Sequence, residues 1–452
     1  MFDRLKSFLF EPKSIAPLVV FRIIFGLATF ISTARFLYLG WVDLHFVNTQ
    51  VQFKYFGFEW VQLAPPFVMY AIHYLMLAAS LGIVFGAFYR VSAIVFFISF
   101  TYCELIDITY YLNHYYFVSL IAFLLIWMPA NAHFSWDAFV KPPIRKSFVP
   151  AFTIHIFKFQ LILVYFFAGI AKINYTWLME ALPLKIWLPA NSDFPFIGWL
   201  FNYPLTAHVF SWAGMLFDIS IGLFLLLPQT RFFAWLLVLF FHLLTGALFQ
   251  IGVFPLVMVA CTLIFFSAHF HQSILLFLNK FIKFPFLSEP NYAGEKPAGN
   301  LLGSSLITGV ILCWVSFHIL FPLRYVLYPG NLFWTEEAYR FGWRVMLMEK
   351  AGTATFYVQE KSSQREGVVD NSDFLNVHQE KQMAMQPDLI LQYAQFLKNH
   401  YQKQGVSVDK VRAEVYVTLN AKPSKLLFNP QLNLSEIVDS WAPKTWLNRF
   451  EE

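Results

Sequence analysis

Residues 150–172 read PAFTIHIFKFQLILVYFFAGIAK, a stretch in which Lys158 and Lys172 are the only charged side chains. A helix needs about 20 predominantly apolar residues to cross the hydrocarbon core, because each residue adds about 1.5 Å and the backbone must satisfy its own hydrogen bonds. This stretch therefore predicts a membrane-spanning helix. The whole chain has the same character, since 58% of its 452 residues are hydrophobic and only 13% are charged, about half the charge of a typical soluble domain.

Eight further stretches have similar length and composition, so the sequence predicts about nine spans. They are residues 16–38, 67–88, 91–111, 115–130, 205–228, 232–249, 253–270 and 302–325. For 115–130 and 253–270, a re-entrant segment is an open alternative. The composition turns polar near Tyr328, so we expect a transmembrane helical domain over 1–327 and a water-exposed domain over 328–452.

The C-terminal domain has the patterns of mixed α and β structure. Thr355 to Gln359 and Arg412 to Leu419 alternate apolar and polar residues, whereas Gln386 to Gln402 repeats apolar residues at helical spacing and Gly405 ends that helix. The predicted fold class is a polytopic α-helical membrane protein with a strand-rich, extracytoplasmic α+β domain. All three cysteines precede this domain, so we expect it to fold without a disulfide.

Basic residues in the connecting loops predict the orientation, because lysine and arginine are retained on the cytoplasmic side. With nine spans, one side of the membrane receives Arg4, Lys6, Lys13, Arg90, Lys141, Arg145, Lys146, Arg231, Lys280, Lys283 and Lys296. The opposite loops contain only Lys54 and Lys185, with Lys172 at a helix end. The N-terminus is therefore predicted to be cytoplasmic and the C-terminal domain external. The net charge of +5 is too modest to indicate a nucleic-acid partner.

Ionisable side chains inside the predicted spans cost at least about 2.5–3.5 kcal/mol each at a helix centre, so each invites an explanation. They are Arg22, Glu104, Asp107, Lys158, Lys172 and Asp218. Arg22 and Asp218 lie at similar depth, which favours a structural ion pair between them. Lys172 has no acidic neighbour in sequence, and apolar surroundings disfavour its charged form, so a neutral amine there is a candidate general base. A lysine that extends to the lipid headgroups fits the pattern equally well.

Further polar side chains fall at the same outer end of the bundle as Lys172. Asn113 and His114 lie between the third and fourth predicted spans, and His242 lies in the seventh, shortly before Phe254 and Met258. A histidine at such a place is more often a hydrogen-bonded interface residue than a catalyst, and a stripe of aromatic and methionine residues is ordinarily packing. Metal-ligand spacing, a phosphate-binding glycine loop and a nucleophile elbow are all missing from the sequence, so we expect no metal.

The same residues resemble the vitamin K-dependent gamma-carboxylase family, within the wider group of horizontally transferred transmembrane (HTTM) domain proteins. The resemblance runs nearly end to end and depends on the order and spacing of short motifs. These are Phe21-Arg-Ile-Ile-Phe-Gly26, Leu112-Asn-His-Tyr115, Val164-Tyr-Phe-Phe-Ala-Gly169 with Ala171-Lys172, Asp218, Phe241-His242, Ile251-Gly-Val-Phe254, Trp334-Thr335 and Tyr339-Arg-Phe-Gly-Trp343.

The resemblance implies a role for three of these residues. Lys172 matches the family's lysine that deprotonates vitamin K hydroquinone, and Asn113 and His114 match residues that assist at the quinone oxygen. In the family, O2 then adds to the anion, and the resulting alkoxide removes a proton from the γ-carbon of a protein glutamate. CO2 captures the carbanion, and the quinol ends as an epoxide. The alkoxide is a strong base, and it survives only where bulk water is excluded.

The resemblance also implies a wall that contacts the quinone, made of Phe254, Met258, Trp343 and Met346, with His242 nearby. We therefore expect a bacterial-type carboxylase of the inner membrane that uses a menaquinol-type vitamin K hydroquinone with O2 and CO2. Its expected partners are the lipid bilayer, the reduced quinone and a glutamate-containing protein or peptide.

This chain departs from the animal members at two places. Phe53 occupies the position of the first cysteine of a disulfide in the animal members. Met348 and Lys350 replace a histidine and an arginine in the segment that approaches the glutamate in the family. A carboxylate substrate needs a cation or a donor pair, for which Lys350 and Arg344 are the candidates.

Two alternatives to the carboxylase interpretation stay open. One is quinol oxygenation without glutamate carboxylation, and the other is a transporter or lipid-binding protein of the same fold, because a fold does not determine a function. The sequence contains no internal repeat of the kind common in transporters.

Overall fold

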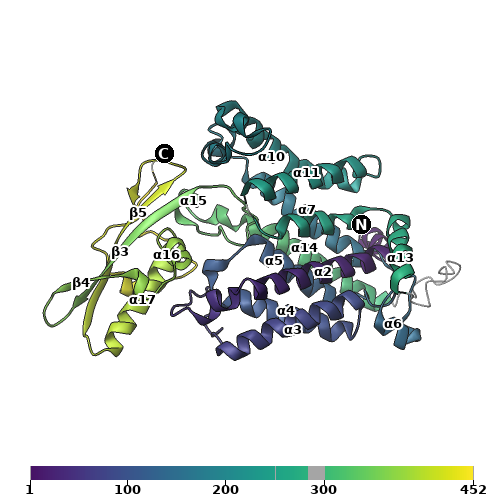
Figure 1. Cartoon of the computed structure of the whole chain (residues 1–452), viewed down its shortest axis with the longest axis horizontal. Coiled ribbons are helices and arrows are strands. Elements are labelled where there is room, and N and C mark those ends of the chain that lie inside the picture. Colours follow the sequence, from purple (N-terminus) through teal and green to yellow (C-terminus); the bar gives the residue numbers. More distant parts are fainter. Residues whose placement is uncertain (1, 250, 283–300, 451–452) are drawn as a thin grey trace.

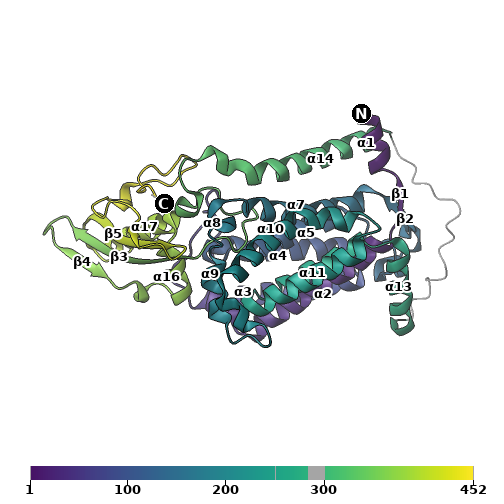
Figure 2. The ribbon, with the colours of Figure 1, turned by 90° about the horizontal axis from the view of Figure 1, so that it is seen from above.

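The computed structural model describes residues 2–249, 251–282 and 301–450, and it has two parts (Figure 1). A helical bundle is joined at one end to a domain built on a β-sheet, and the N-terminus lies at the opposite end of the bundle (Figures 1 and 2). Lys283 and Lys296, which contributed to the predicted orientation, lie outside the described residues.

The elements follow one another in a simple order along the chain. The helices are α1 (Phe2–Leu9), α2 (Ala16–Tyr38), α3 (Pro66–Phe85), α4 (Tyr89–Ile106), α5 (Asn113–Trp127), α6 (Trp136–Val140), α7 (Phe152–Ala171), α8 (Tyr175–Leu178), α9 (Leu184–Trp187), α10 (Pro204–Leu226), α11 (Arg231–Phe249), α12 (Phe254–Cys261), α13 (Ala268–Ile282), α14 (Leu301–Leu320), α15 (Leu332–Thr335), α16 (Val377–Met383) and α17 (Pro387–Lys403). The strands are β1 (Pro12–Ser14), β2 (Phe148–Pro150), β3 (Lys350–Glu360), β4 (Glu366–Val369), β5 (Val408–Leu419) and β6 (Lys425–Leu426).

Among the described residues, seven helices are long and apolar enough to cross a membrane, so the chain is an integral membrane protein of the predicted fold class. They are α2, α3, α4, α7, α10, α11 and the stretch Gly303–Leu327, which begins in α14. The two remaining predicted spans are irregular. The helix α5 has only 15 residues, and the apolar stretches Phe254–Phe265 and Ala268–Phe281 meet at 117°. The predicted count of nine is therefore approximate.

The C-terminal domain is a four-stranded antiparallel sheet in the order β4-β3-β5-β6, with α17 against it (Figure 1). The helix buries Leu389, Tyr393 and Leu397 at a spacing of four residues, which places them on one face. Tyr393 meets Phe356 of β3 edge to face, with ring centroids 4.8 Å apart. The predicted helix and both predicted strands are confirmed, and the strands are longer than expected because their ends are paired too.

A loop from the bundle completes the core of this domain. The side chains of Val51, Phe53 and Tyr55 are buried in the same cluster as residues of β3, β5 and α17. The amide nitrogen of Gln379 donates to the carbonyl of Val51 at 2.8 Å and to Asp107 at 2.7 Å. Packing and hydrogen bonds thus join the two parts, and all three cysteines are free.

The predicted ion pair between Arg22 and Asp218 is wrong. The guanidinium of Arg22 is buried and donates to three backbone carbonyls, those of Phe134 at 2.7 Å, Ala130 at 2.9 Å and Val84 at 3.3 Å. Two carbonyls of the loop between α5 and α6 and one from the last turn of α3 satisfy this cation in place of a carboxylate. Asp218 instead pairs with Lys172.

Candidate active site

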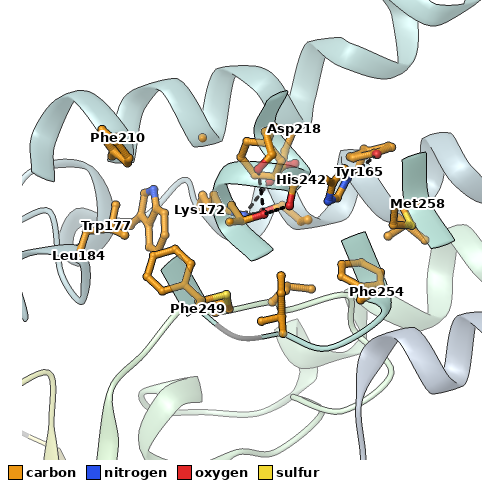
Figure 3. A pocket seen from close by; sticks show the side chains of 18 of the residues that line it. Tyr165, Lys172, Trp177, Leu184, Phe210, Asp218, His242, Phe249, Phe254 and Met258 are labelled. Atoms are coloured by element: carbon orange, nitrogen blue, oxygen red, sulfur yellow. Dashed lines mark hydrogen bonds and ion pairs between the residues drawn. The ribbon is translucent and has the colours of Figure 1, made fainter. Parts of the chain in front are cut away.

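A cavity of about 110 Å³ lies between α7, α10, α11 and α12 (Figure 3). Its wall is almost entirely apolar and rich in aromatic side chains, as is typical of sites for small organic molecules. The lining residues are Val164, Tyr165, Ala168, Lys172, Trp177, Leu184, Trp187, Phe210, Gly214, Asp218, Phe241, His242, Thr245, Phe249, Ile251, Phe254, Met258, Val345 and Met346.

An ion pair is the central polar feature of this cavity. Lys172 follows the last residue of α7, and its Nζ donates to Asp218 Oδ2 at 2.7 Å and to the carbonyl of Ala168 at 3.2 Å (Figure 3). The two side chains are only 8% and 5% exposed. At that burial the pair interacts far more strongly than it would in water, and a cation at the end of a helix is further favoured by the helix dipole.

A glycine explains why α7 and α10 bring these side chains together. A Cβ atom added to Gly169 would lie 2.7 Å from the backbone nitrogen of Ile219, the residue after Asp218. Only glycine permits so close an approach of the two helices. Gly169 thus fixes the distance between α7 and α10 at the level of the ion pair, which depth counting in the sequence could not reveal.

His242 lies on the other side of the cavity. Its Nε2 and the hydroxyl of Tyr165 are 2.8 Å apart, while its Nδ1 is buried without a hydrogen-bond partner among the described residues. Phe254 meets the His242 ring edge to face at 5.8 Å. Because buried nitrogen atoms are nearly always satisfied, Nδ1 is a free hydrogen-bonding position for a bound molecule.

The other predicted pair, Asn113 and His114, lies behind the cavity wall. The His114 ring stacks on Phe254, with centroids 5.1 Å apart, and lines a neighbouring cavity of about 30 Å³. Asn113 donates to the carbonyl of Arg344 at 2.8 Å and accepts from the hydroxyl of Tyr111 at 3.0 Å. Asn113 therefore holds the backbone of the segment that forms the cavity wall.

That segment, residues 338–346, has an unusual backbone. Ala338, Phe341, Trp343 and Met346 have φ between 53° and 60°, a region that residues other than glycine rarely adopt. Such strain persists only where surrounding contacts enforce it, and it is common at functional sites. Met346 lines the cavity, as do Phe254 and Met258. Trp343 lies behind the wall and stacks on Tyr116 at 5.0 Å.

The two candidates for glutamate binding have different surroundings. Lys350 is buried and donates to Glu336 at 2.8 Å and to the carbonyl of Trp334 at 2.9 Å, away from the cavity. Its charge is already neutralised. Arg344 lies next to Val345 of the cavity wall, and its guanidinium covers the Tyr325 ring at 4.2 Å. Among the described residues Arg344 has no carboxylate partner.

The sequence did not single out Tyr165 or Trp177, although both line the cavity. The Trp177 ring lies 5.4 Å from Lys172 Nζ and closes the cavity on that side. Tyr165 stands seven positions before Lys172, two helical turns along the same face of α7, which is the signal that would have found it. Among the described residues, no group of three or more His, Cys, Asp or Glu side chains has a geometry that would hold a metal ion.

The fold and this cavity define a class of protein: a polytopic helical membrane protein with a buried ion pair in an aromatic pocket beneath an α+β domain. Two family models match the sequence, the HTTM domain over residues 10–270 and the "Vitamin K-dependent gamma-carboxylase, lumenal domain" over residues 303–452. No solved structure matches it. The chain belongs to the vitamin K-dependent gamma-carboxylase family.

Proposed function

We propose that this chain is a peptidyl-glutamate carboxylase that couples oxidation of vitamin K hydroquinone by O2 to the addition of CO2 to glutamate. The single observation that carries the proposal is the buried pair of Lys172 and Asp218 in an aromatic cavity below the C-terminal domain. Family membership adds the reaction class.

The cavity suits a hydroquinone, which is a flat aromatic molecule with two hydroxyl groups. Phe254, Met258 and Met346 offer apolar contacts to the ring, while Lys172 and His242 Nδ1 offer polar contacts to the hydroxyls. Most of the lining is apolar, so binding would displace water and strengthen the interactions of the remaining polar groups.

In this proposal a proton of the Lys172 ammonium first moves onto Asp218, and the neutral amine that results then accepts a proton from a hydroxyl of the substrate, so that Asp218 is a positioning residue. The two side chains are buried and their charged atoms lie 2.7 Å apart, so the proton passes between them without entering solvent. Asp218 then stabilises the ammonium that forms. The His242 ring, held by Tyr165, orients the substrate.

Arg344 is the proposed contact for the substrate carboxylate, because it adjoins the cavity wall and pairs with no carboxylate in the described part of the chain. We expect Arg344→Gln to lower CO2 incorporation about 10- to 100-fold relative to epoxide, which corresponds to the loss of one charge-assisted hydrogen bond. Arg344→Lys keeps the positive charge, so its CO2 incorporation relative to epoxide should fall less than that of Arg344→Gln.

One experiment tests both the function and this contact. The purified full chain in lipid is given vitamin K hydroquinone, O2, labelled CO2 and a glutamate-containing peptide, and the epoxide and the peptide label are measured separately. The proposal expects both products in the parent. Epoxide without label in the parent would support the uncoupled quinol oxygenase, the alternative favoured by Met348 and by the engaged Lys350. If the parent forms neither epoxide nor peptide label, the result would indicate a non-enzymatic protein. An unchanged ratio of peptide label to epoxide in Arg344→Gln would exclude Arg344 as the contact for the substrate carboxylate.

We further propose that the chain lies in a bacterial inner membrane with the N-terminus in the cytoplasm. The support is the predicted charge asymmetry together with the name of the second family model, which describes a lumenal domain. Reporter fusions within residues 141–146 are expected to read cytoplasmic and those just after Tyr328 external. Both reporters on one side would contradict the orientation.

A further inference from the structure

The helices α10 and α11 form one edge of the bundle and one wall of the catalytic cavity (Figure 1). Only residues 227–230 join them, so the two helices run antiparallel. Phe217 of α10 stacks on Phe241 of α11, with ring centroids 4.2 Å apart. Leu216 and Leu243 are exposed on the same two helices, and such apolar surface of a membrane-spanning bundle suits contact with lipid tails.

About one turn from the Phe217–Phe241 pair, the line of contact between α10 and α11 changes from large to small side chains. Gly214 stands three residues before Phe217, and Thr245 stands four residues after Phe241. Each therefore lies on the same face as its aromatic neighbour, and the antiparallel course brings both to one level. Both line the catalytic cavity. The Thr245 hydroxyl donates to the carbonyl of Phe241 at 2.8 Å, so its proton is engaged within its own helix.

Gly214 is a glycine that helix packing does not explain. It is buried, yet a Cβ atom added there would meet no heavy atom of the described residues within 4 Å. At Gly169, in contrast, an added Cβ would lie 2.7 Å from the backbone nitrogen of Ile219. A glycine inside a helix lowers the stability of that helix relative to alanine, so the empty space points to a function. This empty space, at Gly214 and Thr245, is the α10–α11 gap.

The α10–α11 gap adjoins the polar groups of the catalytic cavity. Asp218, which pairs with Lys172, stands four residues after Gly214 on the same face of α10. His242 lines the cavity as well, and its Nδ1 is buried without a hydrogen-bond partner in the described part of the chain. A molecule in this cavity therefore meets polar groups and an apolar opening side by side.

Bulky rings line the cavity again on the other side of the α10–α11 gap. They belong to Phe210 of α10 and Phe249 of α11. Phe210 packs edge to face on Phe201 at 5.9 Å, and Phe249 packs edge to face on Trp187 at 5.7 Å. Aromatic side chains thus flank the gap along both helices, which confines it to one level of the bundle.

We propose that Gly214 is a specificity-determining residue, which together with Thr245 lets the apolar chain of a hydroquinone pass between α10 and α11 into the bilayer. This inference rests on the proposed carboxylase function and adds which hydroquinones the cavity accepts. The ring lies against Lys172 and His242, and the chain leaves through the α10–α11 gap. The cavity of about 110 Å³ has no room for a long chain beside the ring, whereas lipid is a favourable surrounding for that chain.

The test compares Gly214→Leu with Gly214→Ala and with a control, Gly309→Leu. Gly309 belongs to α14 and does not line the cavity, and an added Cβ there also meets no described atom within 4 Å. With a tetraprenyl methylnaphthohydroquinone, we expect Gly214→Leu to raise KM for epoxide formation about 10- to 100-fold, the range for one methylene group too many in an apolar pocket. Gly214→Ala should raise KM less, and Gly309→Leu should match the parent.

A second measurement needs no turnover. It is the rise in the melting temperature of the full chain when an oxidised quinone binds to the folded state. With the tetraprenyl quinone, the parent and Gly309→Leu should show this rise, and Gly214→Leu should lose it. With methylnaphthoquinone, which has no chain, Gly214→Leu should keep the rise of the parent, because the ring does not occupy the α10–α11 gap.

Three results would overturn the α10–α11 gap as the outlet for the chain. The first is a KM and a melting temperature with the tetraprenyl quinone that Gly214→Leu leaves unchanged. The second is the loss of both rises in Gly214→Leu, which would mean that Gly214 makes room for the ring. The third is a parent that responds to neither quinone. If the parent binds the quinones but forms no epoxide, the proposed function fails, and the melting temperatures alone decide the role of Gly214.

Discussion

Lys172→Ala is expected to abolish hydroquinone oxidation, with a loss of at least about 100-fold and up to about 10⁴-fold, the range that a general base contributes. The amine is the only lysine or arginine side chain that lines the catalytic cavity in the described part of the chain, and this proposal gives His242 an orienting role only. The measurement is the rate of epoxide formation at saturating hydroquinone. A rate near that of the parent would remove Lys172 from the chemistry.

The same substitution leaves Asp218 buried without its partner, and breaking a buried ion pair typically costs about 3–5 kcal/mol. A loss of activity in Lys172→Ala alone could therefore reflect unfolding. The double variant with Lys172→Met and Asp218→Leu removes both charges and is expected to regain the thermal stability of the parent while remaining inactive. Recovery of stability without recovery of epoxide formation separates the catalytic role of Lys172 from its structural one.

Lys350→Ala is expected to destabilise the C-terminal domain by about 3–5 kcal/mol. The Lys350 and Glu336 side chains are only 2% and 7% exposed. Burial lowers the pKa of Lys350, although Glu336 opposes the shift, so the domain depends on this carboxylate to keep the amine charged. The measurement is protection of the domain from limited proteolysis as temperature rises.

The matched control again removes both charges, with Lys350→Met and Glu336→Leu in one protein. Its proteolysis is expected to return close to that of the parent, since replacing a buried pair by apolar residues is often neutral. If Lys350→Ala were as stable as the parent and lowered only peptide labelling, the original assignment of Lys350 to glutamate binding would be the better one.

Most of the fold could be predicted because hydropathy and periodicity are properties of single segments. Residues 150–172 are apolar enough to define α7 alone, and the spacing of Leu389, Tyr393 and Leu397 defines α17. The loop around Phe53 was assigned to the bundle by its position in the chain. Its place in the core of the C-terminal domain depends on contacts across more than 300 residues, which no local pattern contains.

The site was predicted less completely, because depth in the membrane does not determine which way a side chain points around a helix axis. Arg22 and Asp218 were paired by their depth, yet Arg22 donates to backbone carbonyls such as that of Phe134, and Asp218 forms an ion pair with Lys172. His114 was expected at the same end of the bundle as Lys172, and Phe254 stands between its ring and the catalytic cavity. Rotation about each helix axis follows from close packing at residues such as Gly169, and that information exists only in three dimensions.

The placement of the cysteines has a practical consequence for spectroscopy. Cys103 and Cys261 are buried, and Cys313, the exposed one, lies in an apolar helix. Water-soluble thiol reagents should therefore react little with the native chain, which is close to a cysteine-free background without redesign. Single cysteines introduced on α17 and on a loop of the bundle would then carry spin labels or fluorophores, and the distance between the labels would measure the placement of the C-terminal domain against the bundle.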